Sequence, residues 1–253
     1  MSYKCAFLGC GGRARGHAAA YEHLTRGQKV ACCDLDETRL DAFAADFAIP
    51  RKYQNLDEML EKEQPDLVHM VTRPNLRHGL MKHLSDAGVK AVLVEKPICI
   101  GADDYYQLRE LQAQSPTKFA VNHQLRHHPM ILQLLADVQA GKFGEVKFID
   151  ASAVLPMSGQ GVHVLDLMFA FNGYAPVQTV FGASSGYTDL GCEHPSPQDA
   201  ESLITFTNGT RAALQAGVGS PMFEEGPSWG HKRIAVYGTH GYFHWRMNAW
   251  EKS

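Results

Sequence analysis

The chain has no apolar run that approaches the roughly 20 residues that a helix needs to span a bilayer. It has no marked excess of either charge, because 24 Lys and Arg residues face 27 Asp and Glu residues, which gives a formal net charge of −3. A nucleic-acid partner or a membrane partner is therefore not expected. The N-terminus has no secretory apolar segment and leads directly into an apolar strand. Together these absences predict a cytoplasmic protein.

The six cysteines form no C-x-x-C pair. Cys32 and Cys33 are neighbours on a predicted strand, so their side chains point to opposite faces. We expect free thiols in a reducing compartment rather than disulfides. The 13 histidines are spread along the chain. The group His123, His127 and His128 lacks the glutamate spacing of a zinc helix, so no metal site is predicted.

Repeats and low-complexity segments are absent, and the 253 residues suffice for one large domain or two modest ones. The first half alternates strands and helices, which is typical of an α/β fold with a doubly wound parallel sheet covered on both faces. Its strands are predicted at residues 4–8, 29–34, 67–71, 91–94 and 119–121. Its first helix is predicted after the glycine segment 9–14 and through about residue 25, and the others at 37–47, 57–63, 77–87 and 102–114.

The second half has fewer helices and more strands, and the boundary is expected near residues 122–124. Helices are predicted at 129–140 and 162–171, and strands at 146–155, 177–181, 202–207, 210–218 and 233–237. Asn208-Gly209 between two β-rich runs is a strong hairpin signal. This pattern predicts an α+β domain with an open, mainly antiparallel sheet.

A glycine motif, Gly9-x-Gly11-x-x-Ala14, lies where a predicted strand turns into a helix. Glycines let the turn close and let backbone amides approach a pyrophosphate, whose charge the helix N-terminus favours. Asp34 follows Ala14 by 20 residues and is placed to bind the adenosine ribose hydroxyls. An acid there repels a 2′-phosphate, so NAD is favoured over NADP, although Arg39 weakens that preference. The alternative is a glycine turn followed by a surface acid.

The segment Thr72-Arg73-Pro74-Asn75 follows another strand at the same expected edge of the sheet. Pro74 holds the loop open, Thr72 and Asn75 offer polar contacts near a cofactor, and His78 opens the next helix. The alternative is a helix-capping loop with no ligand.

Glu95-Lys96-Pro97 comes directly after the apolar run 91–94. Ligands bind at the ends of strands in open α/β sheets, so two charges at this position indicate a functional site. The pKa of Lys96 should fall near the positive ring of a nicotinamide, which suits proton transfer. Glu95 is expected to orient Lys96 or the cofactor. The alternative is a structural ion pair.

His163 and Asp166 stand three residues apart at the start of a predicted helix and can share one face. A histidine with a carboxylate partner is a good general base near neutral pH. The alternative is a histidine packed in the core.

Taken in chain order, these motifs resemble those of the glucose–fructose oxidoreductase/inositol dehydrogenase (Gfo/Idh/MocA) family, over the whole chain. The matching segments are the glycine loop, Asp34, Thr72-x-Pro74-Asn75, Glu95-Lys96-Pro97, Asn122-His123-Gln124-Leu125-Arg126 and Gly161-x-His163-x-x-Asp166. The Glu-Lys-Pro element after a Rossmann strand is the most specific of them.

The resemblance implies an NAD(P)-binding Rossmann domain over residues 1–122. It implies an α+β domain over residues 123–253 that binds substrate and forms homo-oligomers through its open sheet. The implied activity is the NAD(P)-dependent oxidation of a sugar or polyol hydroxyl, or the reverse reduction.

The resemblance also carries residue roles. Lys96 is the catalytic lysine, His163 matches the histidine of the family's Asp-x-x-x-His motif, and Arg126 joins both as a substrate contact. The implied cofactor-binding residues are Gly9, Gly11, Gly12, Arg13, Ala14, Asp34, Thr72, Pro74, Asn75, His78, Glu95, Lys96 and Gln124.

Two departures from the family pattern stand out. Gly159 occupies the position four residues before His163, where the family often has aspartate. The chain ends at Ser253, soon after the predicted strand at 233–237, so the second domain is expected to be incomplete at its C-terminus and its sheet to have an exposed edge.

Three functions follow from the sequence. The first is a dehydrogenase that transfers hydride between a sugar or polyol and NAD. The second, suggested by Gly159 and by the short C-terminus, is a cofactor-sensing or sugar-binding protein without redox activity, because a fold does not fix a function. The third is redox-assisted glycoside cleavage on the same fold.

Overall fold

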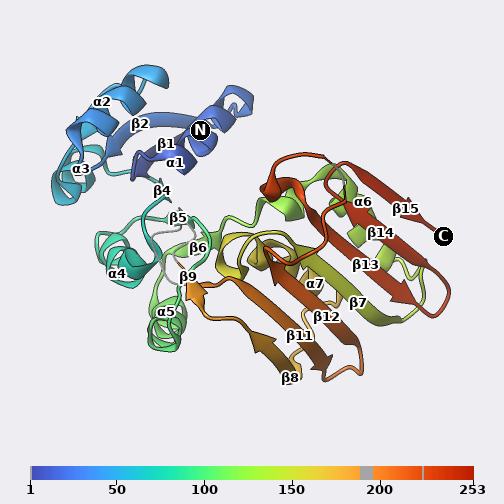
Figure 1. Cartoon of the computed structure of the whole chain (residues 1–253). Helices are drawn as coiled ribbons and strands as arrows, with labels where there is room; N and C mark the ends of the chain where they lie inside the picture. Colours follow the sequence, from blue (N-terminus) through green and yellow to red (C-terminus); the bar gives the residue numbers. More distant parts are fainter. Residues whose placement is uncertain (1, 189–195, 224) are drawn as a thin grey trace. The chain divides into compact units, whose positions relative to one another are not determined.

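The computed structural model describes residues 2–188, 196–223 and 225–253 (Figure 1). Cys192, one of the six expected free thiols, lies outside this part of the chain. The chain divides into two compact units, Met1–Asn122 and His123–Ser253. Among the described residues, no helix has both the length and the apolar character needed to cross a membrane.

The N-terminal unit is built on a six-stranded sheet in the order β3-β2-β1-β4-β5-β6, in which all paired strands are parallel. Its strands are β1 (Tyr3–Leu8), β2 (Gly27–Cys33), β3 (Arg51–Tyr53), β4 (Leu67–Met70), β5 (Ala91–Val94) and β6 (Lys118–Val121). Its helices are α1 (Gly12–Ala19), η1 (Ala20–His23), α2 (Glu37–Asp46), α3 (Leu56–Glu63), η2 (Pro74–Leu76), α4 (Arg77–Asp86) and α5 (Ala102–Gln114). This is the doubly wound Rossmann arrangement that the alternating pattern predicted.

The last four residues of β1, Cys5 to Leu8, are apolar and buried, because the sheet is covered on both faces. Successive side chains point to opposite faces. Phe7 therefore packs with Phe43 in one core cluster, while Leu8 packs with Met59 and Met70 in another.

One local prediction in this unit was wrong, and one strand was missed. The helix expected through residue 25 ends at Ala19 and continues only as the short 3-10 turn η1. Strand β3 was not predicted, because Arg51 and Lys52 are exposed and only Tyr53 is buried. A short edge strand with one buried residue carries no alternation that a sequence reading can detect.

The C-terminal unit has a seven-stranded sheet in the order β15-β14-β13-β7-β12-β11-β8. The strands are β7 (Val146–Ala153), β8 (Val177–Ser184), β11 (Asp199–Phe206), β12 (Arg211–Gly217), β13 (Lys232–Gly238), β14 (Tyr242–Arg246) and β15 (Ala249–Lys252). All neighbouring pairs are antiparallel except β7 and β12. The open, mainly antiparallel sheet is therefore confirmed. A two-stranded ribbon of β9 (Tyr187–Thr188) and β10 (Ser196–Pro197) accompanies it.

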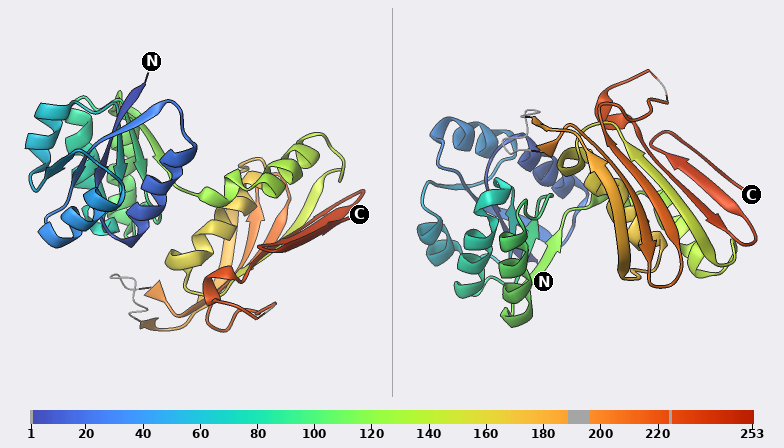
Figure 2. Two further views of the ribbon diagram at one scale, coloured as in Figure 1. Left: turned by 90° about the horizontal axis from the view of Figure 1, so that it is seen from above. Right: turned by 60° about the horizontal axis from the view of Figure 1, so that its bottom comes forward.

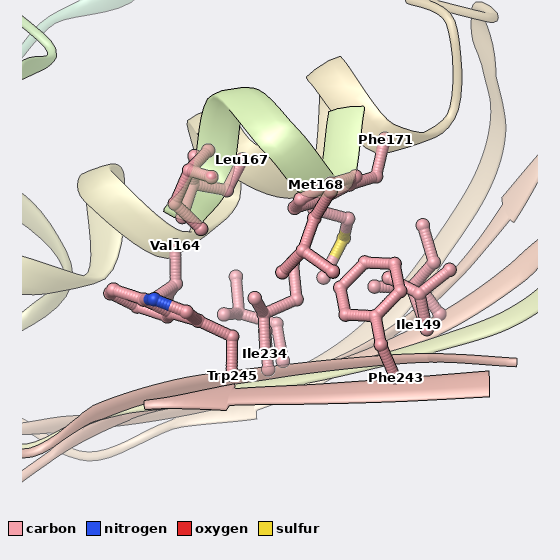
Figure 3. Packing of buried hydrophobic residues seen from close by; sticks show 14 of the residues in the cluster. Ile149, Val164, Leu167, Met168, Phe171, Ile234, Phe243 and Trp245 are labelled. Carbon is pink, nitrogen blue, oxygen red and sulfur yellow. The ribbon is translucent and has the colours of Figure 1, made fainter. Parts of the chain in front are cut away.

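Helices cover one face of this sheet (Figure 2). They are η3 (Gln124–His127), α6 (Pro129–Gln139), the π-helical turn η4 (Met157–Gly161) and α7 (Val162–Phe171), and the short 3-10 turn η5 (Ser228–Gly230) lies before β13. Apolar residues of α7 meet apolar residues of the sheet in a core that includes Val164, Leu167, Met168, Phe171, Ile149, Ile234, Phe243 and Trp245 (Figure 3).

Strands β14 and β15 extend the sheet beyond the last strand that the sequence predicted, at 233–237. The signal for β14 was present, since Phe243 and Trp245 are buried and alternate with Tyr242, His244 and Arg246.

Candidate functional site

The predicted cofactor residues of the N-terminal unit gather at the carboxyl edge of its sheet. Gly9 directly follows β1, Asp34 directly follows β2, and Glu95 directly follows β5. The loop that begins at Val71 follows β4. Parallel strands end at one edge, and this edge is where open α/β sheets bind ligands. The structure thus brings together segments that are up to 87 residues apart in sequence, from Gly9 to Lys96.

The glycine loop between β1 and α1 has room for an anion. Gly9 has φ +90°, and a Cβ atom there would lie 2.4 Å from the carbonyl oxygen of Val71, so only glycine fits. A Cβ atom on Gly11 or Gly12 would meet no atom within 4 Å. Helix α1 has no side-chain cap and no acid in its first turn. Its first amide groups are therefore available to a pyrophosphate.

The next two residues of the motif have different environments. The side chain of Arg13 is exposed, and Ala14 is fully buried against the sheet. The third position of the motif therefore serves close packing of the helix on the strands, as in dinucleotide-binding folds.

Asp34 is hydrogen-bonded on both carboxylate oxygens. Its Oδ2 atom accepts from the backbone N–H of Cys10 at 2.8 Å, and Oδ1 accepts from Asp36 N at 2.9 Å and from Arg39 Nη2 at 3.0 Å. Burial on its own would raise the pKa of Asp34, but the bonds from Arg39 and from the two amides outweigh it and lower the pKa. Asp34 is therefore an anion at neutral pH, as a ribose-binding acid must be.

The loop after β4 is held by a residue that the sequence reading did not single out. Pro74 is buried, Asn75 is exposed, and His78 is half-buried in the first turn of α4. Arg77 is only 2% exposed, and its Nη2 atom donates to the carbonyl oxygen of Thr72 at 2.9 Å. Burial lowers the pKa of Arg77 to about 10, although the charge of Glu95 acts to raise it. Because this value is still well above 7, Arg77 remains a cation at neutral pH.

Glu95 and Lys96 occupy the end of β5. Glu95 is buried, and its Oε1 atom lies 3.0 Å from His17 Nε2 and 2.5 Å from Asn122 Nδ2. Lys96 is half-buried. Burial on its own would raise the pKa of Glu95, but the two hydrogen bonds, and then the charges of His17 and Lys96, lower it. An ionised carboxylate therefore precedes the lysine.

The predicted residues of the C-terminal unit form a second cluster around Asp166 in α7. Both carboxylate oxygens of Asp166 accept from Arg126, with Nε at 2.5 Å from Oδ2 and Nη2 on Oδ1. The guanidinium also lies over the ring of Tyr174, with 5.2 Å to its centroid. His163 is buried, and its ring makes an edge-to-face contact with that of His123 at 6.0 Å.

Two further predicted positions lie near that cluster in sequence. Gln124 is exposed at the start of η3, and Gly159 lies inside the π-helical turn η4 that leads into α7. Among residues 2–188, 196–223 and 225–253, no group of three or more His, Cys, Asp or Glu side chains could hold a metal ion.

Residues 3–123 match the model of the Gfo/Idh/MocA family, whose description is an oxidoreductase family with an NAD-binding Rossmann fold. The matched segment holds the glycine loop, Asp34, the Thr72 loop and Glu95-Lys96-Pro97. Over residues 3–123 the chain is similar to the Gfo/Idh/MocA oxidoreductase family.

One curated relative is the D-apiose dehydrogenase of Paraburkholderia graminis, which is 29% identical over 184 residues. The match covers 65% of this chain and 48% of the relative, so the chain spans about half the length of that enzyme.

Two solved structures share the fold of almost the whole chain. The WlbA dehydrogenase of Bordetella pertussis, in complex with NADH and UDP-GlcNAcA, is 18% identical, with a TM-score of 0.83 over 99% of this chain and 82% of that one. The scyllo-inositol dehydrogenase of Lactobacillus casei is also 18% identical, with a TM-score of 0.80 over 96% of this chain and 75% of that one.

Proposed function

We propose that the chain is an NAD-dependent dehydrogenase that acts on a hydroxyl group of a sugar or polyol, or reduces the corresponding carbonyl. The observation that carries this proposal is the position of Lys96, which follows β5 at the same sheet edge as the glycine loop and Asp34. A cation beside a dinucleotide site can stabilise the negative charge that develops on oxygen when a hydroxyl group is oxidised.

Residues at this edge are suited to hold NAD. The amides of Gly11 and Gly12 would bind the pyrophosphate, the Asp34 carboxylate would accept from the ribose hydroxyls, and the Thr72 loop would lie near the nicotinamide half. Exposed Gln124 is a further candidate contact. NAD, when bound, supplies the hydride acceptor.

The remaining chemistry falls to side chains. In the proposed reaction the Lys96 ammonium stabilises negative charge that develops on the substrate oxygen. His163 accepts the hydroxyl proton, which is a role that suits imidazole near neutral pH. Arg126 is the proposed substrate contact. Its Nε and Nη2 atoms bind Asp166, so only the rest of the guanidinium group would contact a substrate.

Cofactor preference follows from Asp34. A carboxylate that is ionised and held by three donors repels a 2′-phosphate, which favours NAD. Arg39 is exposed and already engaged by Asp34, so it offers little to NADP.

The relatives motivate the substrate class. One curated relative is named as a dehydrogenase of D-apiose, which is a sugar, and one structural neighbour as a dehydrogenase of scyllo-inositol, which is a polyol.

The direct test is hydride transfer. A panel of C-deuterated sugars and polyols is incubated with the full chain and NAD or NADP, and the deuterium content of the reduced cofactor is measured by mass spectrometry. The proposal expects label in NADH from at least one substrate. The absence of label with every substrate would contradict it.

Gly159 favours one competing function. The glycine lies in η4 where the family often has an acid, so a proton-accepting group is missing from this turn. A cofactor-sensing protein without redox activity would bind NAD tightly and release no labelled cofactor in the same assay, which separates the two functions.

We also propose that the chain forms homo-oligomers through the open face of its C-terminal sheet. Phe181 is 78% exposed and Leu203 is 59% exposed, and they pair across β8 and β11. The rings of Tyr237 in β13 and Tyr242 in β14 stack on each other and add aromatic surface to the same sheet. Sedimentation velocity on the chain and on Phe181→Lys tests this proposal. A wild-type chain that stays monomeric at micromolar concentration would contradict it.

A further inference from the structure

A chain of buried hydrogen bonds crosses the interior of the N-terminal unit from Tyr21 to Glu95. The phenol oxygen of Tyr21 lies 2.7 Å from His69 Nε2, and His69 Nδ1 lies 3.0 Å from His17 Nδ1. His17 Nε2 in turn lies 3.0 Å from Glu95 Oε1. All four side chains are at most 9% exposed, so each bond is made away from water.

The direction of the last bond in this chain is determined by the charge of Glu95. Its hydrogen bonds and the cations Lys96 and Arg77 keep the carboxylate ionised. An ionised carboxylate only accepts hydrogen bonds, so His17 must donate its Nε2–H to Glu95. His69 stays neutral, because burial and then the charge of His17 lower its pKa to about 3. A neutral imidazole has one donor and one acceptor, which fits one bond to His17 and one to Tyr21.

Asn122 supplies a second donor to the same oxygen of Glu95, with Nδ2 at 2.5 Å from Oε1. The backbone N–H of Asn122 donates to Val94 O at 2.8 Å, and that of Glu95 donates to Met70 O at 3.1 Å. The carboxylate is therefore fixed from helix α1 on one side and from the end of β6 on the other. Both elements meet at the strand end that carries Lys96.

We propose that His17 is a positioning residue for Lys96. Together with Asn122 it holds the Glu95 carboxylate in one place and in its ionised form, and so fixes the backbone and the local charge from which the lysine projects. The proposal depends on the proposed function for one point, which is that Lys96 is the catalytic cation. It also links α1 to the lysine, because His17 lies in this helix, which directly follows the glycine loop.

A purely structural role would be to pack α1 on the sheet. The two roles differ in what they do to Lys96. A carboxylate held near a lysine favours the ammonium form, so losing or displacing it lets the lysine give up its proton at a lower pH. Loss of packing alone lowers stability and leaves the titration of Lys96 where it was. The charged and titratable groups around Glu95 are His17, Arg77 and Lys96, and only His17 is altered in the main variant.

The test measures the titration of Lys96 in the full chain by NMR of 13C-methylated lysines, with the signal assigned by Lys96→Arg. Glu95→Gln is expected to move the midpoint to lower pH by about one unit, because it removes a unit charge several ångströms away. His17→Leu is expected to move the midpoint in the same direction by less, because the carboxylate is displaced but keeps its charge. His17→Gln keeps a donor and an acceptor, and its midpoint is expected to return most of the way to the wild-type value. The double variant should shift no further than Glu95→Gln alone, because both changes act through one carboxylate.

Tyr53→Phe is the matched control. It also removes one buried hydrogen-bonded side-chain group of this unit, the hydroxyl that donates to Glu63, but it lies outside the Glu95 network. It should lower stability and leave the titration of Lys96 unchanged. If His17→Leu does not fold, Asn122→Ala removes the other donor to Glu95 and is predicted to shift the midpoint in the same direction.

A midpoint unchanged in His17→Leu or in Asn122→Ala, with stability reduced as in Tyr53→Phe, would overturn the proposal. In turnover assays, His17→Leu should lower kcat about tenfold and leave the KM for NAD within about twofold. The NMR titration needs no substrate. A failure of the dehydrogenase assignment would therefore appear as absent turnover with the lysine shift intact, and a failure of this inference as turnover without the shift.

Discussion

The carboxylate of Asp34 accepts a hydrogen bond at 2.8 Å from the backbone N–H of Cys10, and this bond joins the end of β2 to the glycine loop. The acid that would bind the ribose thus also holds the loop that would bind the pyrophosphate. A change at Asp34 should alter both the strength and the selectivity of cofactor binding.

Asp34→Ser is expected to raise the KM for NAD at least tenfold, which corresponds to about 1.4 kcal/mol of binding free energy. It should narrow the preference for NAD over NADP, because the charge that repels a 2′-phosphate is gone. Steady-state kinetics with both cofactors measure this. Asp36→Ser is the control, because it removes a carboxylate two residues away and keeps a residue that can cap α2. The preference of this variant for NAD over NADP should match that of the wild type. An unaltered preference in Asp34→Ser would contradict the assignment.

Substitutions of two glycines in the same loop should have different effects. Gly9→Ala places a Cβ atom against Val71 O at φ +90°, and we expect it to lower the free energy of unfolding by about 1–3 kcal/mol. Gly11→Ala meets no atom and should cost about 1 kcal/mol or less as a changed helix cap. Its methyl group enters the space for the pyrophosphate, so NADH affinity should fall instead.

Urea unfolding and fluorescence titration with NADH separate these outcomes. Wild-type stability in Gly9→Ala would be inconsistent with the loop geometry. Undiminished NADH affinity in Gly11→Ala would show that the cofactor does not approach this backbone.

The pairing of Arg126 with Asp166 predicts a stability effect in the C-terminal unit. Arg126→Ala leaves a buried carboxylate without its two charged donors, and a loss of about 1.5–3 kcal/mol is expected. Replacing both residues by leucine should cost less than Arg126→Ala alone, because no buried charge is left uncompensated. Chemical denaturation measures the free energy of unfolding of the wild type, of Arg126→Ala and of the double variant. A double variant less stable than Arg126→Ala would argue against the pairing.

Asp137 should make the C-terminal unit sensitive to acid. Its carboxylate is buried and accepts from Lys142 at 2.7 Å, from Lys252 of β15 at 2.7 Å and from Gln133 at 3.0 Å. These bonds, those from Lys142 and Lys252 above all, hold the pKa of Asp137 well below its usual range. A carboxylate with a lowered folded-state pKa contributes stability above its unfolded pKa of about 3.9, and this stability is lost as the pH falls below that value.

Asp137→Asn should therefore be less stable than the wild type at pH 7 by about 1.5–3 kcal/mol. The gap should begin to narrow as the pH falls below about 5 and should go on narrowing down to the lowered folded-state pKa of Asp137. Thermal unfolding across this range measures the gap. Glu145→Gln removes an exposed partner of Lys147 and should leave stability nearly unchanged at any pH, because exposed ion pairs contribute little. A gap for Asp137→Asn that is constant with pH would refute the charge-based explanation.

Local signals in the sequence predicted most of the fold. The apolar runs of β1, β4 and β5, the glycine loop and the helical spacing of Leu40 and Phe43 are all short-range patterns, and they place the loops at one sheet edge by topology alone. Strand β3 was not predicted because it buries only one residue. Strand β14 was not predicted either, although Phe243 and Trp245 alternate with polar neighbours.

Contacts between distant residues could not be predicted in the same way. His17 and Glu95 are 78 residues apart, and neither residue carries a local signal of the other. Arg77 sits between the motif residues Asn75 and His78, and only its burial marks it as a support of the Thr72 loop. Pairing of Asp166 with Arg126 likewise depends on how η3 packs against α7.

The dehydrogenase assignment depends most directly on Lys96, so the deciding measurement is the turnover of Lys96→Ala with a substrate that the panel identifies. The account predicts a loss of about 100-fold or more in kcat, within the range for removal of a group that handles the proton or the developing charge. Lys90→Ala, which removes a lysine that is 76% exposed, should retain wild-type turnover. A Lys96→Ala chain that produces NADH at the rate of Lys90→Ala would contradict the account.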